Sequence, residues 1–284
     1  MTDLLLTSRP VSWVNTAYPF AAAYLLSTGG ISWVLVVGTV FFLFPYNLAM
    51  YGINDVFDYE SDLRNPRKGG AEGAVVDRSR HRGILWTSGI TVVPFAIVLS
   101  TQGTLAANIA LLVSLAAVVA YSAPRLRFKE RPFLDSATSS THFVSPAVYG
   151  LLLGGAEFSA GLWCLVAAYF LWGMASHAFG AVQDIVPDRE TGLGSVGTVL
   201  GARATVAAAV AAYCGAGLLM LGSAWPGPLA ALLALPYVAN VLPFLRLDDA
   251  GSGAANRGWK RFLWLNYATG FVVTLLLIWY VAIR

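Results

Sequence analysis

Long apolar segments that alternate with short charged ones limit most strongly how this chain can fold. A transmembrane α-helix needs about 20 predominantly apolar residues to cross a bilayer. Nine segments of roughly that length occur, at about 12–28, 31–55, 84–101, 104–122, 135–154, 160–183, 203–222, 226–245 and 260–282. Of the 284 residues, 57% are hydrophobic and only 12% are charged. The sequence therefore predicts an all-α polytopic membrane protein with nine transmembrane helices, forming a single membrane-embedded domain over residues 1–284.

The cationic residues indicate how these spans are oriented. Lys and Arg precede the first span and follow spans two, four, six and eight, at Arg9, residues 64–82, residues 125–131, Arg189, Arg203 and residues 246–261. The loops on the other side, such as STGG, TQGT and GSAWPG, contain neither residue. Because short cytoplasmic loops are enriched in Lys and Arg, we expect a cytoplasmic N-terminus and an external C-terminus in the plasma membrane.

An acidic cluster closes the second predicted span. Its polar residues are Asn54, Asp55, Asp58, Glu60 and Asp62. On a continuous helix, Asp55, Asp58 and Asp62 fall within about 60° of one another, whereas Glu60 points about 140° away from Asp55. Three carboxylates on one face repel one another, and a bound cation would relieve that repulsion.

A second acidic pair closes the sixth predicted span, in SHAFGAVQDIVPDRETG. Asp184 and Asp188 are four residues apart, so a helix places them about 40° from each other, although Pro187 can loosen that helix. Both clusters end an even-numbered span and so face the cytoplasm. Magnesium is commonly bound by one or two carboxylates together with substrate phosphates. We therefore predict a Mg²⁺–diphosphate site; the alternative is a pair of charged helix ends beside the membrane.

These motifs resemble those of a known family. Asn54-Asp55-x-x-Asp58-x-x-x-Asp62 resembles the NDxxDxxxD motif of the UbiA superfamily of intramembrane prenyltransferases, and Asp184-x-x-x-Asp188 resembles its DxxxD motif. The resemblance implies a UbiA-like bundle of nine helices around a central cavity, which binds an isoprenyl diphosphate through Mg²⁺. It implies metal binding by Asn54, Asp55, Asp58, Asp62, Asp184 and Asp188, with catalytic roles for Asp55, Asp58 and Asp184.

Basic residues near the motifs are candidates for binding the diphosphate. Arg67 and Lys68 lie in the glycine-rich stretch RKGGAEG, and Arg189 directly follows Asp188. The family often has a YxxxK element after span four; here Tyr121 and Arg125 match it, with Arg in place of Lys. Arginine can bind a phosphate through two parallel hydrogen bonds. The general enrichment of cations in cytoplasmic loops is the alternative explanation.

His177 is a candidate catalytic residue inside a predicted span. Polar residues in transmembrane segments usually face the interior of the bundle. His177 precedes Asp184 by seven residues, or two helical turns, which places it deeper on nearly the same face. We expect it to lie between the metal site and the acceptor, as a cavity wall or proton acceptor. A hydrogen bond between helices is the alternative.

Other stretches resemble one branch of the family, the lycopene elongases. They are SRPVSWVNTAYPFAAAYLL, NPRKGGAEGAVV and SHAFGAVQDIVPDRETGLGSVGTVLG. This resemblance implies dimethylallyl diphosphate as donor, lycopene as acceptor and C45 or C50 carotenoids as products. The alternatives are a quinone precursor or another aromatic or lipid acceptor and, in different classes, a membrane transporter or a non-catalytic subunit of a heteromeric enzyme. As partners we expect membrane lipid, no nucleic acid, and, as an option, another subunit from the carotenoid pathway.

Overall fold

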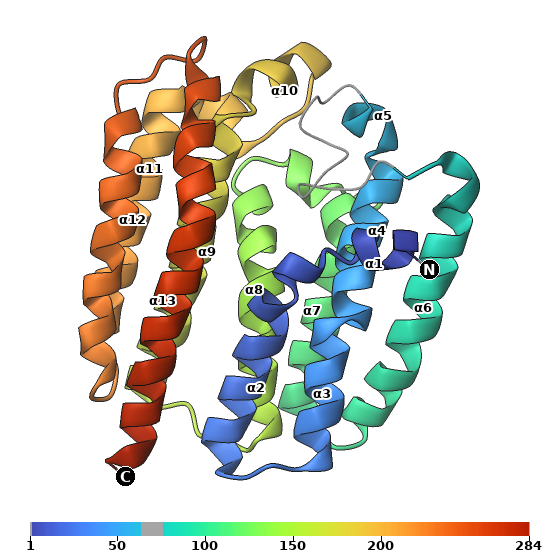
Figure 1. The fold of residues 1–284 in the computed structure, drawn as a ribbon, viewed down its shortest axis with the longest axis vertical. Helices are drawn as coiled ribbons and strands as arrows, with labels where there is room; N and C mark the ends of the chain where they lie inside the picture. The colour runs from blue at the N-terminus through green and yellow to red at the C-terminus, as the bar shows by residue number, and fades with distance from the viewer. Residues whose placement is uncertain (1, 64–75, 284) are drawn as a thin grey trace. The chain divides into compact units, whose positions relative to one another are not determined.

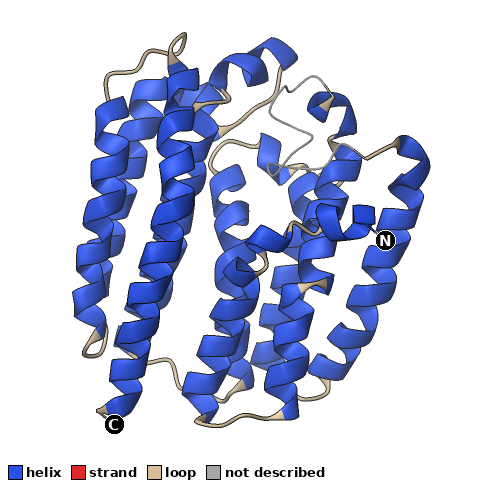
Figure 2. Ribbon diagram, in the orientation of Figure 1, coloured by secondary structure: helices blue, strands red, loops and turns tan. Residues whose placement is uncertain are grey.

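The computed structural model describes residues 2–63 and 76–283, which form helices, turns and loops without a β-strand (Figure 2). The chain divides into two compact units, one of residues 1–128 and 141–157 and the other of residues 129–140 and 158–284. The predicted all-α class is confirmed for the described residues. That residues 1–284 form a single membrane domain stays a prediction.

The first unit contains the N-terminal helices. They are α1 (Thr2–Thr7), α2 (Val14–Thr28), α3 (Trp33–Leu43), α4 (Pro45–Phe57), α5 (Tyr59–Asp62), α6 (Arg78–Ser100) and α7 (Leu105–Ser122), with the 3-10 helices η1 (Pro10–Ser12) and, at the boundary, η2 (Phe128–Glu130). The larger, C-terminal part of α8 (Leu134–Leu153) also belongs to this unit. Here α3 packs beside α2, and α4 packs against α6 and α7 (Figure 1).

The second unit contains the C-terminal helices and the start of α8. They are α9 (Ala160–Val182), α10 (Ile185–Thr191), α11 (Val196–Met220), η3 (Gly227–Leu233), α12 (Ala234–Val241), η4 (Leu242–Phe244), η5 (Ser252–Ala255) and α13 (Asn256–Ala282). The long helix α11 packs along α9 and beside α12, which in turn contacts α13. Within this unit, α10 and the loop between η4 and η5 lie at one end of the helices, and α13 ends at the other (Figure 1).

Seven helical segments of the described residues are long and apolar enough to cross a membrane. They are Trp33–Phe57, Arg78–Ser100, Leu105–Ser122, Ala160–Val182, Val196–Met220, Gly227–Phe244 and Ser252–Ala282. The first and fifth predicted spans also form helices, α2 and α8, but α2 has only 15 residues and α8 begins with the polar stretch DSATSSTH. The predicted count of nine spans is therefore not confirmed.

A break at Pro45 separates α3 from α4 within one membrane span. Proline has no backbone N–H, so a carbonyl in the preceding turn loses its helical partner. At the break, the side chain of Asn47 donates through its Nδ2 to two neighbouring carbonyl oxygens, those of Phe42 (2.7 Å) and Leu43 (3.1 Å). Thr16 Oγ1 also donates to the Phe42 oxygen at 2.7 Å. These bonds lie at the start of α4, whose last turn carries Asn54 and Asp55 of the first acidic motif.

Each unit has its own aromatic core. The core of the first unit includes Phe20, Phe41, Phe42, Tyr46 and Tyr149. The core of the second includes Phe179, Tyr213, Tyr237, Phe244 and Phe262. Close packing in the first core requires a glycine at position 38, since a Cβ there would lie 2.1 Å from the ring of Phe20. Tyr46 of α4 and Phe179 of α9 belong to these cores, so core packing holds each helix that leads to an acidic motif.

Candidate functional site

The first acidic motif lies where α4 ends and α5 begins, in the first unit. Phe57 is the last residue of α4, and Asp58 follows as its C-cap with φ −102° and ψ 2°. The predicted helix over residues 54–62 is thus interrupted at Asp58, in a backbone region where many active-site residues occur. Asp55 and Asp58 are both buried, at 3% and 7% exposed. The side chain of Asp62 lies outside the described part of the chain.

Each buried carboxylate of this motif has an arginine beside it. Arg9 Nη2 donates to Asp55 Oδ1 at 2.8 Å, and its guanidinium lies 4.2 Å from the ring centroid of Tyr51. Arg127 Nη2 lies 3.5 Å from Asp58 Oδ1. Burying an isolated carboxylate is costly unless a positive charge lies nearby. Arg9 and Arg127 therefore offset the negative charge of the motif.

The other polar residues of the motif have different partners. Asn54 Oδ1 accepts a 2.9 Å hydrogen bond from Ser122 Oγ, at the end of α7. Glu60 pairs with Arg78 at the start of α6, and its side chain is 63% exposed. Glu60 therefore points away from Asp55 and Asp58, as the sequence predicts, and it is not part of the buried acidic cluster.

The Tyr121–Arg125 element lies at the end of α7 and in the loop that follows. The ring of Tyr121 meets that of His142 edge to face, with centroids 5.1 Å apart. Arg125 is exposed and has a left-handed backbone, with φ 74°. Two neighbours in the same stretch contact the first motif: Ser122 contacts Asn54, and Arg127 contacts Asp58. No sequence pattern predicts a role at the motif for Ser122 or Arg127, and diphosphate binding by Tyr121 and Arg125 stays a prediction.

The second acidic motif lies on the short helix α10, in the second unit. Asp184 is the N-cap residue of α10. Pro187 falls in the first turn, where its missing N–H removes no helical hydrogen bond, and so it leaves α10 intact. Asp184 and Asp188 are half-buried, whereas Val186 and Pro187 between them are exposed. The two carboxylates therefore share the less exposed side of α10.

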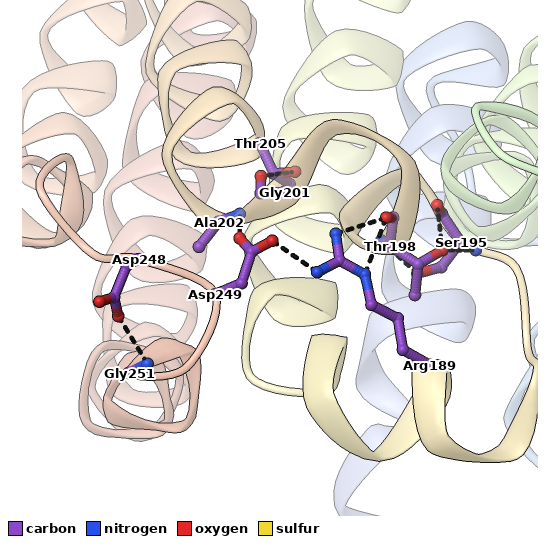
Figure 3. Close-up of polar contacts among 9 residues, drawn as sticks. All are labelled: Arg189, Ser195, Thr198, Gly201, Ala202, Thr205, Asp248, Asp249 and Gly251. Carbon is purple, nitrogen blue, oxygen red and sulfur yellow. Dashed lines mark hydrogen bonds and ion pairs between the residues drawn. The ribbon is translucent and has the colours of Figure 1, made fainter.

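Arg189 forms hydrogen bonds with two segments of its own unit (Figure 3). Its Nη1 donates to Asp249 Oδ2 at 2.5 Å. Its Nε and Nη2 donate to the carbonyl oxygen of Thr198, at 3.1 and 2.7 Å. The other carboxylate oxygen of Asp249 accepts from the N–H of Ala202 at 2.6 Å. The Ala202 N–H, and then Arg189, hold the pKa of Asp249 below its ordinary value.

His177 contacts a hydroxyl group at the start of α8. Its Nδ1 lies 3.1 Å from Ser136 Oγ, a contact that fits the predicted alternative of a hydrogen bond between helices. The adjacent Asp135 is fully buried and accepts from the N–H groups of Ser136 and Val196, both at 2.7 Å. Asp135 is not among the predicted site residues, although a lone carboxylate at the edge of an apolar span is a signal of a functional position. The catalytic role of His177 stays a prediction.

The oxygen atoms of the two motifs suit magnesium. Among the described residues, no three His, Cys, Asp or Glu side chains form a ready-made metal site. Asn54, Asp55 and Asp58 in the first unit, and Asp184 and Asp188 in the second, offer amide and carboxylate oxygens. Mg²⁺ prefers such donors and usually completes its coordination with water and substrate phosphates. Two further predicted residues, Arg67 and Lys68, lie outside the described residues.

Comparison with known proteins places the chain in a family. The UbiA prenyltransferase family matches residues 16–266. The chain is 57% identical over 284 residues to the C(50) beta-cyclic carotenoids biosynthesis protein LbtBC of Dietzia sp. (strain CQ4), and the match covers 100% of this chain but 66% of that protein. It is 54% identical over 275 residues to a lycopene elongase/hydratase of Corynebacterium glutamicum, covering 97% of this chain and 96% of the relative.

Solved structures show the same fold. A UbiA homolog from Archaeoglobus fulgidus bound to GPP and Mg²⁺ has a TM-score of 0.69 at 19% identity, over 94% of this chain and 98% of that one. The same homolog bound to DMAPP and Mg²⁺ has a TM-score of 0.66 at 18% identity, with the same coverage. Because the family match extends over most of the chain, this protein belongs to the UbiA prenyltransferase family and is a multi-pass integral membrane enzyme.

Proposed function

We propose that this enzyme transfers dimethylallyl groups from dimethylallyl diphosphate to the ends of lycopene, in a Mg²⁺-dependent reaction that yields C45 and C50 carotenoids. The observation that carries this proposal is 54% identity, over almost the whole length of both chains, to a lycopene elongase/hydratase. The structural neighbour bound to DMAPP and Mg²⁺ supports the choice of donor and cation. The relative named for C(50) carotenoids supports the size of the product.

The residues that would hold Mg²⁺ are those of the two motifs: Asn54, Asp55, Asp58, Asp62, Asp184 and Asp188. When bound, Mg²⁺ supplies a Lewis acid that stabilises negative charge on the departing diphosphate. Arg9 and Arg127 hold Asp55 and Asp58 in place through contacts of 2.8 and 3.5 Å. Carboxylates positioned in this way need little rearrangement to bind their ligand, which favours affinity.

Cationic residues near the motifs would neutralise the diphosphate further. Arg67, Lys68 and Arg125 are the cationic candidates, and the hydroxyl of Tyr121 is a further candidate donor, because each lies in the loop that follows a predicted span on the same side as the acids, or directly before that loop. The exposed position of Arg125 supports a role at the mouth of the site. An arginine there offers two parallel donors to a phosphate where a lysine would offer a single point charge.

The reaction breaks the allylic C–O bond of the donor, and its electron pair leaves with the diphosphate. The terminal double bond of lycopene supplies the electrons for the new C–C bond. The resulting cation then loses a proton or gains the oxygen of a water molecule, which in turn gives up a proton. His177, oriented by Ser136 at 3.1 Å, is the candidate acceptor of that proton.

One incubation tests the reaction and the acceptor together. Membranes that contain the protein receive Mg²⁺, dimethylallyl diphosphate and lycopene, and the pigments are separated and analysed by mass spectrometry. Products heavier by one or two C5 units, and absent when EDTA is added, would support the proposal. Unchanged lycopene from correctly inserted protein would contradict it. Parallel incubations with a quinone precursor would then test the main alternative acceptor.

We also propose that the protein lies in the plasma membrane with its N-terminus and both acidic motifs on the cytoplasmic side, as the distribution of Lys and Arg favours. Single cysteines placed at the exposed positions Glu60 and Asp248, in a chain without Cys164 and Cys214, would test this. A membrane-impermeant thiol reagent should label both positions in inverted vesicles and neither in intact cells. Purification from its native membrane would show whether a partner subunit from the carotenoid pathway accompanies it.

A further inference from the structure

Helix α11 is broken shortly after its start. Gly201 has φ 74° and ψ 168°, outside the helical region. A Cβ at this position would lie 2.9 Å from Asp249 Oδ1, so both the positive φ and the close approach require glycine. In a continuous α-helix, the N–H of Ala202 would donate to the carbonyl of Thr198. At this break, side chains from elsewhere in the second unit bind both of these groups.

Asp249 and Arg189 bridge the break (Figure 3). The carboxylate of Asp249 accepts from the Ala202 N–H at 2.6 Å, and the guanidinium of Arg189 donates twice to the Thr198 carbonyl oxygen. The two side chains also bond to each other at 2.5 Å. One residue therefore binds the donor of a helical hydrogen bond, the other binds its acceptor, and their ion pair connects the two.

This bridge connects the second acidic motif to the rest of its unit. Arg189 directly follows Asp188 on α10, which has only seven residues and no side-chain cap at its N-terminus. A helix of this length has little stability of its own, so contacts with the surrounding structure set its rotation. The buried side chain of Ile185 anchors its beginning, and the three hydrogen bonds of Arg189 anchor its end.

We infer that Arg189 and Asp249 are a positioning pair, which orients α10 so that Asp184 and Asp188 can bind Mg²⁺ and diphosphate. This inference rests on the proposed function. It gives Arg189 a different role from the direct diphosphate binding expected from the sequence. Three of the five N–H groups of its guanidinium already donate to Asp249 and Thr198. Arg189 thus acts through α10 rather than on the substrate.

Four variants and one matched control test this pair. The variants are Arg189→Ala, Arg189→Lys, Asp249→Asn and the double variant Arg189→Ala/Asp249→Asn. Asp248→Ala is the control, because Asp248 lies in the same loop and its carboxylate accepts from the N–H of Gly251 at 2.7 Å. The measured quantity is the Mg²⁺ concentration that gives half-maximal binding of the thiolo analogue of dimethylallyl diphosphate to the purified full-length protein. This readout needs no acceptor, and thermal unfolding midpoints show that each variant is folded.

The positioning role predicts that Arg189→Ala and Asp249→Asn each raise this Mg²⁺ concentration by about tenfold, as loss of a residue that orients a metal ligand typically does. The double variant should raise it no further, because the two residues act as one unit. Arg189→Lys should need nearly as much Mg²⁺ as Arg189→Ala, since one ammonium group cannot reproduce the planar guanidinium that binds both Asp249 and Thr198. The Asp248→Ala control should match the wild type.

The inference would be overturned if Asp249→Asn needed the same Mg²⁺ concentration as the wild type for half-maximal binding while Arg189→Ala needed a higher one. Arg189 would then act on the diphosphate directly. Additive effects in the double variant would also overturn it. If Arg189→Ala does not fold, the result for Asp249→Asn tests the inference instead, since the asparagine amide keeps an oxygen that can accept from the Ala202 N–H. Absence of Mg²⁺-dependent binding by the wild type would overturn the proposed function and this inference with it. If the wild type binds the analogue and every variant needs the same Mg²⁺ concentration as the wild type, the inference alone is overturned.

Discussion

The two acidic motifs both lie at helix breaks, but different forces hold them. At the first, the side chain of Asp55 is 1% exposed and that of its partner Arg9 is 18% exposed. Beside the second, the side chains of Arg189 and Asp249 are 44% and 40% exposed. Removing one member of a buried ion pair leaves an uncompensated charge, whereas water screens a pair at the surface. The first motif therefore depends on its counter-ions, and the second depends on the contacts that orient its short helix.

The largest expected effect concerns turnover and tests whether each motif takes part in the proposed metal binding. Asp55→Ala and Asp184→Ala should each lower turnover by more than about 100-fold, because losing one of the proposed metal ligands should exceed the roughly 10- to 100-fold loss seen when a residue that orients a metal ligand is removed. Product formation at saturating donor, per mole of inserted protein, measures this. Glu60→Gln is the control, since Glu60 faces away from the buried acids. Retained turnover in either alanine variant would remove that motif from the metal site.

The next effect separates the motifs by stability. Without Mg²⁺, Arg9→Ala should lower the free energy of unfolding by about 3–5 kcal/mol, because the buried Asp55 loses the guanidinium that donates to its Oδ1. Arg189→Ala should lower it by only about 0–1 kcal/mol, since that pair is partly exposed. Chemical unfolding in detergent measures both values. The double variant Arg9→Ala/Asp55→Asn should recover most of the loss, and equal losses for Arg9→Ala and Arg189→Ala would refute the contrast.

A smaller effect concerns the break that positions Arg189 and Asp249. Gly201→Ala should lower stability by about 1–3 kcal/mol, because alanine must adopt a strained backbone and its Cβ would crowd Asp249 Oδ1 at 2.9 Å. Gly253→Ala is the matched control, since a Cβ there meets no atom within 4 Å. Thermal unfolding of the two variants side by side measures the difference. Similar midpoints would mean that the break at Gly201 is easily accommodated.

The smallest expected effect is a pH dependence at the second motif. The pKa of folded Asp249 lies below its ordinary value, so the carboxylate contributes stability above its unfolded pKa of about 3.9 and loses that contribution as the pH falls through its folded pKa. Wild type should therefore exceed Asp249→Asn in thermal midpoint by a constant margin from neutral pH to about pH 5. That margin should close in stronger acid. A margin independent of pH would show that the charge of Asp249 adds no stability.

Local sequence signals were enough to find the carboxylates but not the shape of the backbone around them. The helical period predicts that Glu60 lies apart from Asp55 and Asp58, and the structure agrees. The same period predicts one continuous helix through Asp58, where the structure has a break. A pattern of neighbouring residues reports which face a side chain occupies, but contacts with other segments decide where a helix stops.

The sequence by itself determined the all-α membrane class and the two acidic motifs, because apolar length, helical period and motif spacing are properties of adjacent residues. Only the tertiary structure decided which residues serve the motifs. Arg9 reaches Asp55 across 46 positions, Asp249 reaches Arg189 across 60, and Asp135 reaches the start of α11 across 61. Residues that far apart in the sequence share no helical period or motif spacing. Such a pair can be identified only from the folded structure, in which packing of the helices brings the two residues within hydrogen-bonding distance.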